Sequence, residues 1–287
     1  FHKASILILG LFIIVSSTSF AQPETIASDR PGNANTAVAV GQKVFQLQSG
    51  FDFQRTAINL TIPDNADPTG FDKIIIHDFA QVNVFRYGVL SNTEINAEVN
   101  LSSETNNIPK NISPDSSNGF FDELSGISKL GLGIRQQLIE ETDKVPAIGL
   151  LASAYFNGIL NDYRGANPDG RLMLLAQKQI FNFLTVTGNL SYSFDQEFKQ
   201  DLFEYTFNLS TGITPNLSTY IEIYGPIESS NIDYTFLDGG FGYLITSDLQ
   251  IDLYGGYKIY QPSISSSIDQ SDIEQFFLST GISYRFM

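Results

Sequence analysis

Apolar and polar residues alternate with a period of two along most of the chain. In the stretch 44–54, VFQLQSGFDFQ, phenylalanine or leucine stands at most alternate positions, with glutamine or aspartate between them. The stretches 93–102, 183–194 and 276–287 repeat this pattern. A period of two is typical of a β-strand with one apolar and one polar face.

The alternating segments predict about twelve strands of roughly ten residues, the length that a tilted strand needs to cross a bilayer. Within one of them the phase changes near Val84 and Phe85, which predicts a β-bulge there. The predicted strands are 44–54, 79–89, 93–102, 128–139, 147–156, 171–179, 183–194, 202–213, 217–226, 234–245, 249–258 and 274–286.

The connections between the predicted strands alternate in length. Those after even-numbered strands are short, as in SNT at 91–93 and TPN at 214–216, whereas most others are longer and polar, as at 103–127. Short periplasmic turns and long external loops are typical of outer-membrane barrels, whose closed sheet leaves no backbone group unpaired in lipid. We therefore predict an all-β fold: an up-and-down antiparallel transmembrane β-barrel of about 12 strands.

A secreted all-β domain is the alternative, because its strands would alternate in the same way with the apolar face inside. Strand length favours the barrel, since strands in other β proteins usually have about five or six residues. Aromatic residues also stand near predicted strand ends, as expected for the aromatic girdles of a membrane barrel. They are Tyr87, Phe156, Phe194, Phe203, Tyr243, Tyr257 and Phe286.

The beginning of the chain has its own pattern. Lys3 precedes an apolar run at 6–15, and small residues follow as far as Ala21, which predicts a signal peptide at 1–21. We expect a periplasmic N-terminal segment or lumen plug at 22–43 and the transmembrane β-barrel at 44–287. If the segment is a plug, Asp29 and Arg30 are the candidates for pairing with charges on the barrel wall.

Charged residues in the predicted strands fall on the polar face. A charge facing lipid would cost about 2–4 kcal/mol at the bilayer midplane, so we expect these side chains to line the lumen. They are candidates for contact with a solute, and the alternative is that they form ion pairs that only hold the wall together. These lumen-lining candidates are Asp52, Arg86, Glu94, Glu98, Lys129, Arg135, Glu204, Glu222, Asp238, Asp252 and Arg285.

Composition excludes several other functions. A net charge of -15 argues against a nucleic-acid partner, which requires a basic surface. The absence of cysteine excludes cysteine-based metal sites, and the acidic loops lack a calcium-binding motif, so we expect no metal and no cofactor. Catalysis would depend on His77, the one histidine after residue 21, and we predict no enzyme activity and no catalytic residues.

Five stretches have the order and spacing of a known family. They are IASDRPGNANTAVAVGQKVFQLQSGFDF (26–53), FRYGVLSNTEINAEVNL (85–101), SKLGLGIRQQL (128–138), FLDGGFGYLITSDLQIDLYGGY (236–257) and FFLSTGISYRF (276–286). Together they resemble the outer-membrane transporter family named for the MetA pathway of phenol degradation. The resemblance covers nearly all of the chain after residue 21 and supplies no catalytic residues.

The resemblance implies an outer-membrane channel or transporter for small solutes. The family name and the many phenylalanines point to apolar or aromatic solutes. The alternative is a non-transporting structural or assembly-partner barrel of the outer membrane. Both functions imply the outer membrane of a Gram-negative bacterium, with membrane lipid and the barrel-assembly machinery as partners. The aromatic strand ending at Phe286 resembles the signal that this machinery reads.

Overall fold

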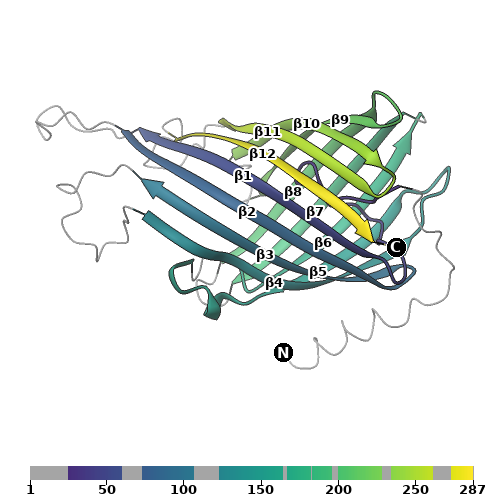
Figure 1. The fold of residues 1–287 in the computed structure, drawn as a ribbon, viewed down its shortest axis with the longest axis horizontal. Coiled ribbons are helices and arrows are strands. Elements are labelled where there is room, and N and C mark those ends of the chain that lie inside the picture. The colour runs from purple at the N-terminus through teal and green to yellow at the C-terminus, as the bar shows by residue number, and fades with distance from the viewer. Residues whose placement is uncertain are drawn as a thin grey trace, which may run out of the picture.

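The computed structural model describes residues 25–59, 73–106, 123–163, 167–181, 183–195, 200–227, 234–260 and 273–286. These residues form a closed antiparallel barrel (Figure 1). Two short 3-10 helices, η2 (Asn157–Ile159) and η3 (Asn161–Tyr163), follow the fifth strand. The strands are β1 (Phe45–Asn59), β2 (Lys73–Leu90), β3 (Thr93–Asn106), β4 (Glu123–Ile139), β5 (Ala147–Tyr155), β6 (Gly170–Ile180), β7 (Leu184–Asp195), β8 (Gln200–Gly212), β9 (Leu217–Ile227), β10 (Tyr234–Thr246), β11 (Leu249–Tyr260) and β12 (Ile273–Phe286).

Each strand pairs with its neighbours in sequence, and β1 pairs with β12 to close the barrel. The predicted up-and-down barrel of about 12 strands is therefore confirmed. The strands are longer than predicted. β2 has 18 residues and begins at Lys73 rather than at residue 79, and its ladder with β1 continues to the pair Asn59 and Lys73. Backbone pairing can continue past the apolar band because it does not depend on the side chains.

The predicted bulge at Val84 and Phe85 is wrong. Both residues stay in register with β1 and β3, and the ladder is interrupted only at the end of the strand, after Gly88. The change of phase in the sequence has another origin. Val82 and Val84 line the lumen, whereas Asn83 lies on the outer face between them.

The outer face of the barrel carries a band of exposed apolar side chains. Phe51, Leu253 and Leu278 on this face are 47–52% exposed. The inner face carries polar and charged residues, among them Gln46 and Glu94, which are fully buried. This arrangement is the reverse of a secreted sandwich, whose apolar face would be inside, and it suits a barrel surrounded by lipid.

Other sequence features lie outside the lumen or outside the described residues. His77 is on the outer face of β2, where its ring stacks on Phe53 with a centroid distance of 5.9 Å. The predicted signal peptide at 1–21 lies outside the described residues, as do residues 60–72 and 107–122. Within the described ranges, no helix is long and apolar enough to cross a membrane.

Candidate functional site

The residues that precede β1 fold back into the barrel. We call residues 25–44 the lumen segment; they form no helix and no strand. In Figure 1 this purple segment lies at the end of the barrel where the C-terminus is located. It joins the wall through a tight turn in which Lys43 N donates to Gly88 O at 2.7 Å. A Cβ atom added to Gly88 would lie 1.6 Å from Gly41 O, so the segment and the wall are in direct backbone contact there.

Asp29 of the lumen segment belongs to a cluster of four charged groups. Its carboxylate lies 2.8 Å from Arg135 Nη2 and 3.3 Å from Arg86 Nη1. Glu94 contacts the same arginines, 2.7 Å from Arg86 Nε and 3.5 Å from Arg135 Nε. Burial alone would raise the pKa of Asp29, but the two guanidinium charges outweigh it and lower the pKa below its usual value. The cluster connects the lumen segment to β2, β3 and β4.

Arg30 reaches the place where β1 and β12 meet. Its Nη2 donates to Asp252 Oδ1 at 2.9 Å and to Ser279 Oγ at 2.8 Å. The guanidinium lies against two glycines that are register partners across the seam, Gly50 and Gly281. A Cβ atom at Gly50 would lie 2.3 Å from Arg30 Nη1. The notch that holds Arg30 therefore depends on the absence of side chains at these two positions.

Backbone N–H groups of the lumen segment bind carboxylates of the wall. Asn33 N and Ala34 N donate to the two oxygens of Glu222 at 2.7 and 2.9 Å. Val40 N donates to Glu94 Oε2 at 2.9 Å. A segment without secondary structure can be buried only when its peptide groups find such partners. These carboxylates therefore determine its path through the barrel.

Asp238 of β10 is a buried carboxylate on the inner face that has no partner in the described part of the chain. It is 3% exposed, and neither of its oxygens makes a hydrogen bond. Glu222 is its register partner on β9 and places a second acidic group beside it. A buried carboxylate without a partner is costly. Asp238 is thus expected to weaken the wall, whereas Asp252 stabilises it through Arg30.

We expect Asp238→Asn to leave the free energy of unfolding unchanged or to raise it by about 1 kcal/mol, because it removes a charge and no hydrogen bond. Asp252→Asn on the neighbouring strand is the matched control. It should lower this free energy by about 1.5–3 kcal/mol through weaker bonds to Arg30. Urea titration of the refolded barrel measures both values. Equal losses in the two variants would show that Asp238 has a stabilising partner.

Two cavities adjoin the lumen segment in the described part of the barrel. One has a volume of about 420 Å³ and the other of about 770 Å³. The larger cavity extends to the short turn at Pro215, and the smaller one extends to Asn100, toward the long connections. Asp29 and Arg30 line both cavities. These two residues therefore lie between the two cavities.

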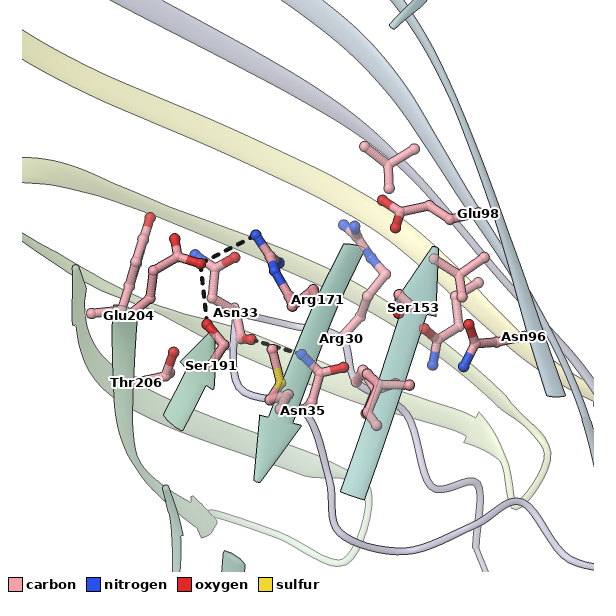
Figure 2. Close-up of a pocket in the computed structure, with 18 of the residues that line it drawn as sticks. Arg30, Asn33, Asn35, Asn96, Glu98, Ser153, Arg171, Ser191, Glu204 and Thr206 are labelled. Atoms are coloured by element: carbon pink, nitrogen blue, oxygen red, sulfur yellow. Dashed lines mark hydrogen bonds and ion pairs between the residues drawn. The ribbon is translucent and has the colours of Figure 1, made fainter. Parts of the chain in front are cut away.

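Two ion pairs line the smaller cavity. Lys129 Nζ lies 3.0 Å from Glu98 Oε1, and Arg171 Nη2 lies 3.2 Å from Glu204 Oε2. Figure 2 shows Arg171 and Ser191 pointing toward the carboxylate of Glu204, to which the serine hydroxyl donates at 3.1 Å. The four charged side chains are 20–33% exposed, so a solute in this cavity would meet them directly.

A different part of the inner face, on β9–β12, is aromatic. Its rings contact one another in a chain: Tyr220 and Tyr254 have centroids 6.4 Å apart, Tyr254 and Phe277 6.0 Å, Phe277 and Phe236 6.3 Å, and Phe236 and Tyr224 5.2 Å. We call these five residues the aromatic wall. It was not among the sites expected from the sequence. Each member lies an even number of positions from a charged residue on its own strand and therefore shares its face. Counting from these charged residues would have placed the aromatic wall on the inner face.

The structure places every charged residue proposed to line the lumen on the inner face of the barrel. Arg285 forms an ion pair with Asp248 in the β10–β11 turn at 2.6 Å and also donates to Thr25 O at 3.3 Å. Asp52 accepts a hydrogen bond from Ser279 at 2.5 Å. Most of these charges are therefore paired, either with one another or with the lumen segment.

Sequence reasoning did not find Arg171, although it lines the smaller cavity. Its neighbours on the same face of β6 are Met173 and Leu175, and the opposite face carries the charged residue Lys178, so alternation alone does not identify the inner side of this strand. In the described ranges, no group of three or more histidine, aspartate or glutamate side chains is placed to hold a metal ion.

The family described as "Putative MetA-pathway of phenol degradation" matches residues 28–266. The chain belongs to this family. The match includes both Asp29 and Arg30 and extends past β11, so the resemblance to the MetA-pathway family found in the sequence is confirmed over most of the barrel. No curated protein matches this MetA-pathway family member.

Solved structures share the barrel fold at low sequence identity. The COG4313 outer membrane channel from Pseudomonas putida F1 is 12% identical, with a TM-score of 0.55 over 90% of this chain and 100% of that chain. The translocator domain of autotransporter NalP from Neisseria meningitidis is 11% identical, with a TM-score of 0.49 over 90% of each chain. The P. putida toluene transporter TodX is 11% identical, with a TM-score of 0.45 over 93% of this chain and 92% of that chain.

Family and architecture together locate this MetA-pathway family protein in the outer membrane of a Gram-negative bacterium, as predicted. Its barrel fold is shared with the COG4313 outer membrane channel.

Proposed function

We propose that the barrel carries small apolar or aromatic solutes across the outer membrane and that the lumen segment is a plug that must move to let them pass. The aromatic wall is the observation that carries this proposal. Tyr224, Phe236 and Phe277 are half-buried and present their rings to the interior, and Tyr224 lines the smaller cavity. Sites for apolar ligands are built mainly from such side chains, with a few polar groups that orient the ligand.

The charged residues of the smaller cavity are compatible with such a solute. Glu98 and Glu204 are each paired with a cation, so an uncharged solute leaves neither of these two charges uncompensated. The family description names phenol degradation, and a phenol combines a ring with one hydroxyl group. Its ring would pack on the aromatic wall while its hydroxyl donates to a carboxylate of the cavity. The similarity to an outer membrane channel supports conduction as the general function.

A non-transporting structural barrel is the second candidate, because the lumen segment is anchored on several sides and lies between the two cavities. Planar-bilayer recordings of the refolded protein distinguish the two functions. If the plug moves to let solutes pass, the full chain conducts ions and a chain that lacks residues 23–42 conducts more. A full chain that does not conduct, beside a deleted chain that does, would favour the structural barrel. Equal conductance of the two chains would show that the segment is not a plug.

The solute class is tested by uptake into cells that carry the protein in their outer membrane. We expect Tyr224→Ser/Phe277→Ser to reduce toluene uptake severalfold, because it removes two rings of the aromatic wall. The comparison variant Arg171→Gln/Glu204→Gln alters the exposed ion pair of the same lumen and should affect toluene uptake little. Heat-modifiable gel shifts verify that equal amounts of folded barrel are present. If the ion-pair variant causes the greater loss, the solute is polar and the proposal is wrong.

A further inference from the structure

The seam between β1 and β12 is where the two ends of the barrel sheet meet, and the strands lie side by side in Figure 1. Their ladder extends from the pair Phe45 and Phe286 to the pair Ile58 and Ile273. Closing it requires strands from opposite ends of the chain to find each other. The entropy cost of loop closure rises with the length of the loop, so this contact is the most remote one that the barrel makes.

The first residues of the lumen segment contact both strands of this seam. Thr25 O accepts a hydrogen bond from Arg285 Nη1 of β12 at 3.3 Å. Ala27 O accepts one from Gln46 Nε2 of β1 at 3.1 Å. These two carbonyl groups are two residues apart in the chain, and one is bound to the last strand while the other is bound to the first.

Ser28 joins the two strands through a single side chain. Its Oγ lies 2.8 Å from Ser283 Oγ on β12 and accepts from Gln48 Nε2 on β1 at 3.3 Å. Gln48 and Ser283 are register partners across the seam. One hydroxyl group thus lies over a matched pair of the ladder and bonds to both of its members.

Arg30 spans the seam in a different way. Its guanidinium fills the notch above the partners Gly50 and Gly281, and its Nη2 binds Ser279 of β12 and Asp252 of β11. Five inner side chains of the seam are almost fully covered. Their exposed fractions are 0% for Gln46, 2% for Gln48, 1% for Ser279, 0% for Ser283 and 3% for Arg285.

We propose that residues 25–30 are a closure staple, which holds β1 and β12 together and promotes their pairing when the barrel forms. The staple is close to β1 in sequence, since Ala27 and Gln46 are 19 residues apart, so docking on β1 closes a short loop. It then offers β12 a polar surface already in place, although Ser28 and Ser283 are 255 residues apart. This function is separate from transport and does not depend on the proposed solute.

Hydrogen–deuterium exchange of the refolded full chain tests the staple. Ser28→Ala/Arg30→Gln removes side-chain contacts with the seam. Thr36→Ala is the control, because Thr36 bonds from the same segment to Gln177 on β6 at 2.8 Å and does not touch the seam. We expect the amides of β1 and β12 to exchange severalfold faster in the first variant, with β7 and β8 unchanged, and no such change in the control. Unchanged exchange at the seam, or an equal rise in all strands, would overturn the inference.

A deletion variant, combined with an engineered disulfide, distinguishes a role of this segment in closing the barrel from a role in plugging the lumen. A chain without residues 22–30 should lose its resistance to SDS at a lower urea concentration. The disulfide from Ser49→Cys/Ile282→Cys joins register partners of β1 and β12 on the outer face and should restore this resistance. The disulfide from Val186→Cys/Leu209→Cys joins partners of β7 and β8 and should not. The chain has no cysteine of its own, so each pair forms without competition.

The two proposals fail in different ways in this experiment. Conductance of the deleted chain reports the plug and should remain high after either disulfide forms. A deleted chain that refolds only with the seam disulfide also supports the staple. Equal rescue by the two disulfides, or no loss of SDS resistance on deletion, would show that residues 25–30 do not hold the seam.

Discussion

Gly50→Ala is expected to raise the single-channel conductance of the refolded barrel severalfold. The added Cβ atom would lie 2.3 Å from Arg30 Nη1 and 2.4 Å from Arg30 Cζ, much closer than unbonded atoms approach. The arginine can turn away, but it then loses its bonds to Asp252 and Ser279, and hydrogen bonds to charged groups contribute about 1.5–3 kcal/mol each. Because Arg30 lines both cavities, its withdrawal would connect them.

The control for this prediction is Gly188→Ala on β7. The nearest atom to its added Cβ would be Thr206 O at 3.9 Å, which is an ordinary contact. We expect this variant to conduct like the wild type. Arg30→Ala should conduct like Gly50→Ala, and the two substitutions together should add nothing further. Wild-type conductance in Gly50→Ala would mean that Arg30 does not separate the two cavities.

The barrel itself could be predicted from the sequence because lipid and water impose opposite demands on alternate residues. On β1, Phe51 faces lipid and Asp52 faces the lumen, and the same parity is visible in the sequence without any structure. The strand ends could not be predicted, since residues such as Lys73 extend the ladder beyond the apolar band. Backbone hydrogen bonding, which leaves no periodic signal, decides where a strand stops.

The path of the lumen segment could be anticipated only in outline. Its polar composition predicted pairing of Asp29 and Arg30 with the wall, but not the partners. Asn33 N binds Glu222 across a sequence separation of 189 residues, and no local pattern encodes that contact. The notch at Gly50 could not be predicted either, because a glycine can occur in a strand for several different structural reasons. The arginine that fills the notch comes from a segment whose sequence has no periodic pattern.

The aromatic wall shows a different limit. Aromatic residues in a membrane strand suggest the lipid interface, yet Phe277 faces the lumen because it lies an even number of positions from Arg285. Its residue type alone therefore suggests the wrong face of the strand, whereas its even spacing from a charged residue identifies the inner face correctly. The same rule is ambiguous on β6, because Arg171 lines the lumen whereas Lys178, an odd number of positions away, lies on the opposite face.

Asp29→Asn is expected to detach the lumen segment from β2–β4 at neutral pH. The substitution leaves Arg86 and Arg135 with Glu94 as the remaining carboxylate of their cluster. Removing one partner of a buried ion pair costs about 3–5 kcal/mol, because the other charges stay buried. The hydrogen bond that Thr36 N donates to Asp29 at 2.9 Å is weakened as well. This is the largest loss that we expect from a single substitution in the segment.

A nitroxide spin label on Ala34→Cys, in a chain with no other cysteine, measures the detachment. The label should be immobile in the otherwise wild-type barrel and should give narrower EPR lines when Asp29→Asn is added. A label on Leu278→Cys, on the lipid-facing side of β12, is the control and should not change. If the label at position 34 stays immobile in the Asp29→Asn chain, the charged cluster does not hold the segment in place.

The carboxylate of Asp29 also determines how the docking of the lumen segment in the wild type should depend on pH. Its pKa is lower in the docked segment than in a free chain, where aspartate has a pKa of about 3.9. The stabilisation that Asp29 contributes is therefore complete above that value and is lost as the pH falls through the lower pKa of the docked form. The spin label should remain immobile from neutral pH down to about pH 4 and become mobile only below it. In Asp29→Asn the label should be mobile throughout, so a transition at the same pH in both chains would assign the acid response to another carboxylate, such as Glu222 or Asp252.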